Sequence, residues 1–153
     1  MLHQALRDMA AWVEDGVTPP ATTAYAVAEG QVHVPASAHD RGGLQPVARL
    51  TADGGERAEV RAGQEVLLLQ AEITCPPGGG GVVAARWDLD GTGAFATAEQ
   101  VGSTARVMLE QRVTFYEPGT RFVTVRACAH RDADPTTPYA RLDTLARARV
   151  VVA

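Results

Sequence analysis

The sequence predicts an all-β sandwich preceded by one helix and an extended segment. From Pro46 onward, short apolar runs alternate with turn clusters rich in Gly and Pro, which is the spacing of strands and turns in a sandwich. Ahead of Pro46, only residues 3–15 repeat apolar residues at intervals of three and four, the pattern of an amphipathic helix. The length of 153 residues and the hydrophobic share of 46% suit one globular domain with an appendage.

The predicted helix ends before Gly16 and the Pro19-Pro20 pair, which cannot continue it. A single helix of this length is marginally stable in water, so its apolar stripe must dock on something. The candidates are the domain that follows and a partner outside this chain. The stripe consists of Leu2, Ala5, Leu6, Met9, Trp12 and Val13.

Residues 17–45 show no sustained periodicity and are expected to form an extended strap. Short β-like runs at Tyr25–Val27 and Gln31–Val34 flank Glu29-Gly30, which predicts one hairpin there. We therefore divide the chain into an N-terminal helix with its strap, residues 1–45, and a sandwich domain, residues 46–153.

Within the sandwich, alternation along each apolar run predicts which side chains face the core. We expect Trp87, one of only two tryptophans, to lie at the centre of that core, between the two sheets. The predicted inward set is Leu67, Leu69, Ala71, Ile73, Val83, Ala85, Trp87, Val107, Leu109, Val113, Phe115, Val123, Val125, Ala127, Ala148, Val150 and Val152.

Two motifs in this region resemble those of the polycystic-kidney-disease (PKD) domain, an immunoglobulin-like sandwich of extracellular and secreted proteins. They are Trp87-Asp88-Leu89-Asp90-Gly91 and the stretch 113–125, VTFYEPGTRFVTV. The resemblance covers about residues 46–153 and implies an immunoglobulin-like (PKD-type) fold and an extracellular or cell-surface location. It also implies that Tyr116 occupies a corner before Gly119, with its hydroxyl bonded to nearby backbone.

The segment LRDMAAWVEDGVTPP resembles a different group of proteins. Residues 2–20 are similar to the last helix of secreted α/β-hydrolases of the tannase and feruloyl-esterase kind, together with the segment that follows that helix. That resemblance implies that this chain is the C-terminal portion of an esterase whose nucleophile and oxyanion hole precede Met1.

The two cysteines, Cys75 and Cys128, lie on strands expected in opposite sheets, where immunoglobulin-type domains place a disulfide. Alternation argues against a bridge, because it puts Cys128 on the outer face with Thr124 and Arg126. Two unpaired cysteines are the favoured interpretation, and a disulfide is the alternative.

The loop after Trp87 contains two carboxylates, Asp88 and Asp90, which are the only candidate metal ligands in the sequence. Calcium prefers six to eight oxygen ligands, and Thr92 stands where a calcium loop would place a third acid. The alternative is a turn in which the aspartates bond backbone amides and the glycines take positive φ. The sequence favours the turn, and it predicts no cofactor.

Nothing in the sequence supports catalysis by this chain. Ser37 and Ser103 are the only serines, neither lies on a G-x-S-x-G elbow, and no third group is specified for His39 beside Ser37. The glycine-rich stretch 75–81 lacks the G-K-[ST] ending of a phosphate loop. The four histidines are too scattered for a zinc site, so we expect them on the solvated surface: His3, His33, His39 and His130.

The net charge of −4 and the absence of a basic stripe argue against nucleic acid and membrane surfaces as partners. No signal layout and no membrane-spanning run occurs. We interpret the chain as a non-catalytic accessory module of a larger, exported bacterial protein, which contacts a neighbouring domain, a protein partner or a polysaccharide. A dedicated carbohydrate-binding module ranks lower, because most of the few aromatic residues are expected to be buried. The alternative is the C-terminal portion of a hydrolase.

Overall fold

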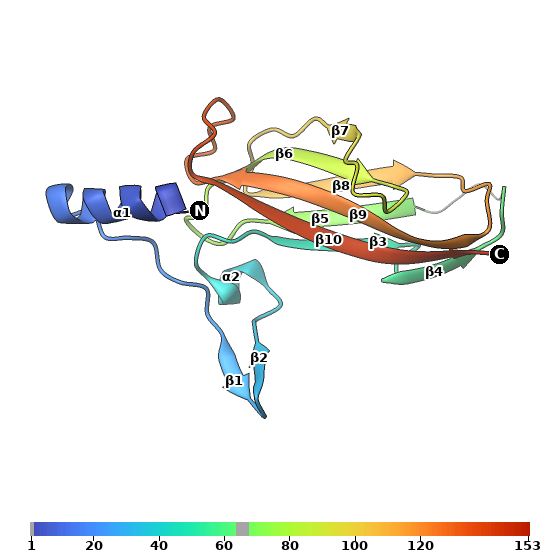
Figure 1. Ribbon diagram of the computed structural model, residues 1–153, viewed down its shortest axis with the longest axis horizontal. Helices are drawn as coiled ribbons and strands as arrows, with labels where there is room; N and C mark the ends of the chain where they lie inside the picture. Colours follow the sequence, from blue (N-terminus) through green and yellow to red (C-terminus); the bar gives the residue numbers. More distant parts are fainter. Residues whose placement is uncertain (1, 64–67) are drawn as a thin grey trace.

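The computed structural model describes residues 2–63 and 68–153 and consists mainly of two packed sheets, with a helix and a hairpin projecting from one end (Figure 1). The larger sheet has the strand order β4-β10-β9-β6-β7, and the smaller has the order β3-β5-β8. The predicted all-β sandwich with one N-terminal helix is confirmed. The sandwich strands are β3 (Val47–Ala52), β4 (Arg57–Val60), β5 (Leu68–Thr74), β6 (Gly81–Asp88), β7 (Thr97–Glu99), β8 (Arg106–Arg112), β9 (Gly119–His130) and β10 (Arg141–Val152).

The core lies between these sheets and is built from alternate residues of each strand. Trp87 is 1% exposed, as expected of the central core residue, and its indole Nε1 donates to Glu99 Oε1 at 2.7 Å. All the predicted inward residues that the structure describes are buried or pack against the core, except Val83. Leu67 lies outside the described residues.

Val82, rather than Val83, is the buried residue at the start of β6. The pairing of β6 with β9 shifts register between Val82 and Ala84, which marks a β-bulge, and Val82 is fully buried. An extra residue on one strand moves the following side chains to the opposite face, so the alternation counted back from Trp87 fails at this point.

Two short strands were not predicted. The edge strand β4 pairs parallel to β10, with Arg57 opposite Arg149, and β7 forms the other edge of the larger sheet. Each alternates small and charged or polar residues, so neither has an apolar run that would mark it as a strand. The pairing partner of β4 also lies far away in the sequence, whereas β7 pairs with the preceding strand, β6.

The prediction for Tyr116 is wrong. Its side chain is 76% exposed, and within the described residues its hydroxyl makes no hydrogen bond. The preceding residue, Phe115, is 4% exposed and occupies the core position instead. Because the aromatic ring of Phe115 has no polar group, the corner is held by apolar packing and not by a hydroxyl.

The N-terminal segment contains more structure than a simple strap. The helix α1 (Leu2–Asp15) agrees with the prediction, and Gly16, with φ of 69°, follows it. The hairpin of β1 (Ala26–Ala28) and β2 (Gln31–His33) turns at Glu29 and Gly30, both with positive φ, as predicted. The short helix α2 (Ala38–Arg41) was not predicted, because it is a single turn.

Candidate interaction surfaces

The helix α1 is attached to the sandwich by its polar side. Asp8 accepts from both terminal nitrogens of Arg131, at 2.8 and 2.9 Å. Gln4 Oε1 accepts from the backbone N–H of Ala140 at 3.0 Å, and the Arg7 guanidinium lies 4.1 Å from the ring centroid of Tyr139. All three contacts reach the loop between β9 and β10, so this loop fixes the position of the helix.

The apolar side of α1 is consequently left in solvent. Trp12 and Met9 are each 57% exposed and Val13 is 79% exposed. Leu6 is more than half exposed as well. An amphipathic helix of a globular domain normally buries this side, so α1 is attached in the opposite sense.

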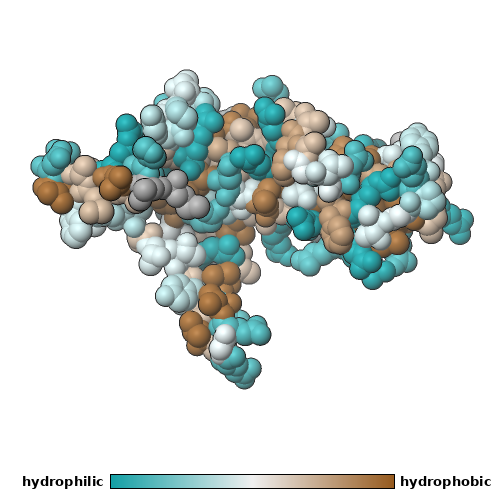
Figure 2. Space-filling model, in the orientation of Figure 1, coloured by the Kyte–Doolittle hydropathy of each residue, from teal (hydrophilic) through white to brown (hydrophobic). Residues whose placement is uncertain are grey.

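The hairpin adds a second exposed apolar face. Val27 pairs with Val32 across the two strands, and Tyr25 and Val34 continue the same face on either side. All four are between 48% and 67% exposed. Hydrophobic surface accordingly covers much of the hairpin and parts of α1 in Figure 2. We call this set the N-terminal apolar surface: Leu6, Met9, Trp12, Val13, Tyr25, Val27, Val32 and Val34.

Hydrogen bonds fasten the base of the hairpin to α2. The N–H of Ala24 donates to the carbonyl of Arg41 at 2.7 Å, and Arg41 Nε donates to the carbonyl of Pro35 at 2.9 Å. Ser37 caps α2 by accepting from the N–H of Asp40 at 3.0 Å.

A groove crosses the outer face of the larger sheet, over β6, β9 and β10. It consists of two depressions of about 660 and 460 Å³ that share Phe95, Arg126 and Asp143. We call it the sheet-face groove. Its further lining includes Arg86, Gly93, Cys128, Pro138 and Arg141 in the first depression, and Gln45, Thr144 and Leu145 in the second.

The sheet-face groove contains more guanidinium groups than carboxylates. Arg126 Nη2 lies 2.6 Å from Asp143 Oδ2, and this hydrogen bond holds the pKa of Arg126 above its ordinary value. Arg141 Nη2 donates to the carbonyl of Pro135 at 2.6 Å. Arg86 is directly opposite Arg126 on the neighbouring strand. Among the described residues, Arg86 has no ion-pair partner.

Sequence reasoning missed this groove. Arg86, Arg126 and Asp143 belong to three different strands, and only the pairing of β6, β9 and β10 brings them together. Each residue alternates normally in its own strand, so no local spacing indicated a shared site. Phe95 reaches them from the loop between β6 and β7, with its ring centroid 6.0 Å from the Arg126 guanidinium.

The two candidate calcium ligands, Asp88 and Asp90, lie in different environments. Asp88 is 4% exposed and accepts from three backbone N–H groups, those of Gly91, Thr92 and Gly93, at 2.7–3.2 Å. Asp90 is exposed. Asp88 therefore organises the turn, and within residues 2–63 and 68–153 no three His, Cys, Asp or Glu side chains gather as metal ligands.

Ser37, His39 and Asp40 lie together at the N-terminal end of α2, but their contacts are not those of a catalytic triad. The Ser37 hydroxyl donates to Asp40 Oδ2 at 2.8 Å, and His39 Nδ1 lies 3.2 Å from the other carboxylate oxygen. The histidine contacts the aspartate and not the serine, so it is not placed to take the serine proton. The hydrogen bond from Ser37 lowers the pKa of the Asp40 carboxyl. The backbone of Ser103 has a positive φ of 53°.

One of the four histidines, His130, is buried and not on the solvated surface. His130 is 2% exposed, contrary to the expected solvated position, and its Nδ1 accepts from the N–H groups of Asp132 and Asp134 at 3.0 Å. His3, His33 and His39 are exposed as expected. Cys75 and Cys128 are unpaired, and burial raises the pKa of both thiols.

The expectation that most aromatic residues are buried is also wrong. Trp87 and Phe115 are the buried ones among two Trp, three Tyr and three Phe. Aromatic rings are therefore available for contacts on the surface. The exposed ones are Trp12, Tyr25, Tyr116, Phe122 and Tyr139.

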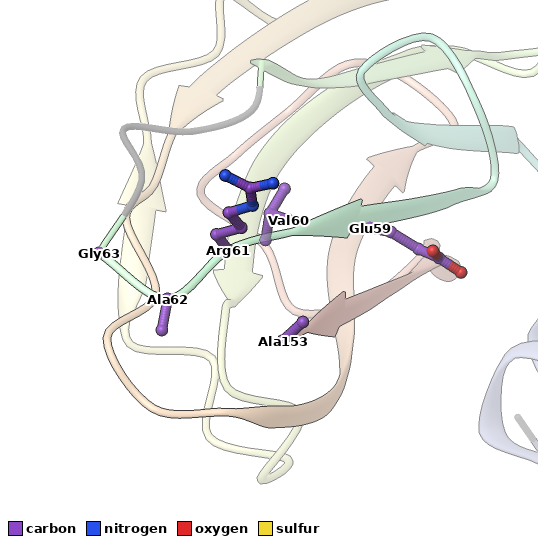
Figure 3. Close-up of a pocket in the computed structure, with 6 residues that line it drawn as sticks. All are labelled: Glu59, Val60, Arg61, Ala62, Gly63 and Ala153. Carbon is purple, nitrogen blue, oxygen red and sulfur yellow. The ribbon is translucent and has the colours of Figure 1, made fainter.

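A further depression, of about 710 Å³, lies beside the C-terminus (Figure 3). It follows the end of β4, where the N–H of Ala62 donates to the carbonyl of Ala153 at 2.9 Å. The side chains of Glu59 and Arg61 extend in different directions in Figure 3 and do not converge on a common point. The other described residues of its lining are small or aliphatic: Val60, Ala62, Gly63 and Ala153.

Comparisons with known proteins do not assign the chain to a family. No protein-family model matches the chain, and no curated protein matches it at a significant level of similarity. Among the described residues, no helix combines the length and apolar character needed to cross a bilayer.

Proposed function

We propose that this chain is a non-catalytic accessory module that mediates protein–protein or protein–carbohydrate contacts within a larger, exported bacterial protein. The observation that carries the proposal is the orientation of α1. The polar side of the helix is bound to the sandwich through Asp8 and Arg131, while Met9, Trp12 and Val13 face solvent. A helix held in this way presents its apolar side to a second protein surface.

The hairpin supports the same function. Its apolar face is exposed on both strands, and an isolated two-stranded hairpin is only marginally stable in water. Exposed apolar patches of this kind mark protein–protein contact sites. We infer that a neighbouring domain or protein partner covers both α1 and the hairpin, since both project from the same end of the sandwich (Figure 1).

The immunoglobulin-like, PKD-type interpretation of the fold is supported by the strand order. In immunoglobulin-like sandwiches, the last strand pairs with the strand before it in the chain. That strand in turn pairs with the strand that contains a buried tryptophan. Here Trp87 lies on β6, β6 pairs with β9, and β9 pairs with β10. On the same family resemblance, we propose an extracellular or cell-surface location.

The second candidate is the C-terminal portion of a secreted α/β-hydrolase, with all catalytic residues outside this chain. The exposed apolar side of α1 favours it equally, because the helix would then pack against the hydrolase domain. The reading frame upstream of Met1 distinguishes the two: a continuous segment with a G-x-S-x-G motif supports the hydrolase.

Site-specific photo-cross-linking tests the contact itself. A benzophenone side chain at position 12 is expected to cross-link to a neighbouring domain or partner in the native host. The matched control is position 116, because Tyr116 is also aromatic and exposed but lies outside the N-terminal apolar surface. Equal cross-linking at the two positions, or none at position 12, contradicts the proposal.

A further inference from the structure

We propose that the sheet-face groove binds an acidic saccharide, with the carboxylate of a uronic acid unit held by Arg86 and Arg126 and the sugar ring against Phe95. The inference rests on the proposed role of the chain as an interaction module, and it adds a site and a ligand class. It uses a surface separate from the N-terminal apolar surface.

The first step is the charge of the groove. Three guanidinium groups, those of Arg86, Arg126 and Arg141, line it together with one carboxylate, that of Asp143. The protein as a whole carries a net charge of −4, so this excess of positive charge is local. An anionic ligand is therefore attracted to this part of the molecule in preference to the rest of the surface.

The second step is the pairing of Arg86 with Arg126. The two residues are directly opposite on β6 and β9, and like charges in that relationship destabilise a sheet. Asp143 compensates one of them, since it binds Arg126 at 2.6 Å. Arg86 keeps its full set of guanidinium donors for a ligand carboxylate, which a guanidinium group can bind through two parallel hydrogen bonds.

The third step is the combination of charge with an aromatic wall. Phe95 lines both depressions and is only half-buried, so one part of its ring faces the groove. Leu145, 57% exposed, extends the apolar strip along β10. Sugar rings have apolar faces that pack on such side chains, and their hydroxyls find polar partners in Gln45 and Thr144.

The shape of the groove favours a saccharide over duplex nucleic acid. Protein elements that read DNA project into its grooves, whereas this site is a depression in a sheet face. The volumes of about 660 and 460 Å³ lie within the range of small-ligand sites, roughly 300–1,000 Å³. A short oligosaccharide of a few units therefore matches the groove.

The test is calorimetric titration with a trimer of galacturonic acid, compared with a neutral galactose trimer of the same length. The wild-type protein is expected to bind the acidic trimer and not the neutral one, and binding should weaken as salt is added. Removal of a charge-assisted hydrogen-bonding pair in Arg86→Gln should weaken binding by about tenfold or more. Phe95→Ala should weaken it as well.

The matched control is Arg106→Gln. Arg106 is an exposed arginine on the other sheet, where it pairs with Glu72 at 2.8 Å, so its loss should leave saccharide binding unchanged. Melting temperatures of all variants confirm that each is folded. An exposed surface arginine contributes little to stability, so Arg86→Gln should fold normally.

Several results would overturn the inference: equal binding of the neutral trimer, binding unchanged in Arg86→Gln, or equally tight binding of a polyglutamate peptide or an oligonucleotide. The last two would assign the groove to anions in general. Loss of saccharide binding together with a retained cross-link at position 12 would overturn this inference alone. Saccharide binding without that cross-link would overturn the protein contact and leave the groove in place.

Discussion

Asp8 and Arg131, separated by 123 residues in the chain, form a two-point ion pair that joins α1 to the loop between β9 and β10. Both side chains are about one-fifth exposed, at 22% and 21%. The pair decides which side of the helix faces the sandwich and which side faces solvent. The exposure of Val13, at 79%, is thus a consequence of a polar contact on the opposite side of α1.

Breaking this ion pair should release the helix without unfolding the sandwich. In Asp8→Asn, we expect faster amide hydrogen exchange in residues 2–15 and unchanged exchange in the sandwich strands, with a local stability loss of roughly 1 kcal/mol. Glu14→Gln is the control, because Glu14 is an exposed carboxylate on the same helix. Equal exchange in the two variants would show that the pair does not hold α1.

The same contact should depend on pH in the acid range. The hydrogen bonds from Arg131 lower the pKa of Asp8 from its usual value of 3.8. A carboxyl with a lowered folded-state pKa contributes stability that is present above pH 3.8 and is lost as the pH falls through the folded-state value. Exchange of the α1 amides, corrected for intrinsic rates, should therefore rise below that pH. Asp8→Asn should show no such transition.

The two tryptophans should contribute very differently to the stability of the fold. Trp87→Ala should lower the free energy of unfolding by about 3–5 kcal/mol, because it removes the largest fully buried side chain and leaves Glu99 without its indole donor. Trp12→Ala should change it by less than about 0.5 kcal/mol, since Trp12 is 57% exposed. Urea denaturation measures both values. A comparable loss in the two variants would contradict the assignment of Trp87 to the core centre.

Substitution of Asp88 should destabilise the protein more than substitution of Asp90. Asp88→Ala leaves the N–H groups of Gly91, Thr92 and Gly93 without their acceptor, at a cost of roughly 1–3 kcal/mol. Asp90→Ala should be nearly neutral, because that side chain is exposed. Calcium should leave the melting temperature unchanged. A rise of several degrees that disappears in Asp88→Ala would restore the metal site.

The proposed absence of catalysis is tested through Ser37. Wild-type protein should not turn over generic acyl esters, and Ser37→Ala should lose only the cap of α2, at a cost of about 1 kcal/mol. Ester hydrolysis that vanishes in Ser37→Ala or Ser103→Ala would contradict the non-catalytic assignment. Comparison with Ser37→Asn, which can still cap the helix but has no hydroxyl nucleophile, separates loss of the cap from loss of a nucleophile.

The strand alternation could be read from sequence because it is a local property. Side chains two residues apart share a face, so the buried sets around Trp87 and Val125 follow from apolar spacing alone. The hairpin turn at Glu29-Gly30 was equally predictable, because two adjacent positive φ values favour Gly at one of them. The error at Val83 arose where a bulge in β6 interrupts that local rule.

The candidate interaction surfaces could not be predicted from the sequence, because they depend on residues far away in the chain. The sheet-face groove requires β6, β9 and β10 to be neighbours, and a single sequence contains no signal for that order. The burial of His130 and the exposure of Tyr116 likewise depend on how loops fold back onto strands.

By itself, the sequence of this protein determined the helix of residues 2–15, the β character of the remainder and most of the core, because periodicity and turn chemistry act over a few residues. Tertiary structure alone decided which side of α1 docks and which arginines share the groove. The apolar stripe of α1 predicted a docked side, yet the geometry of Asp8 and Arg131 turned the polar side inward. Contacts across 123 residues follow from the whole fold, since no local pattern encodes them.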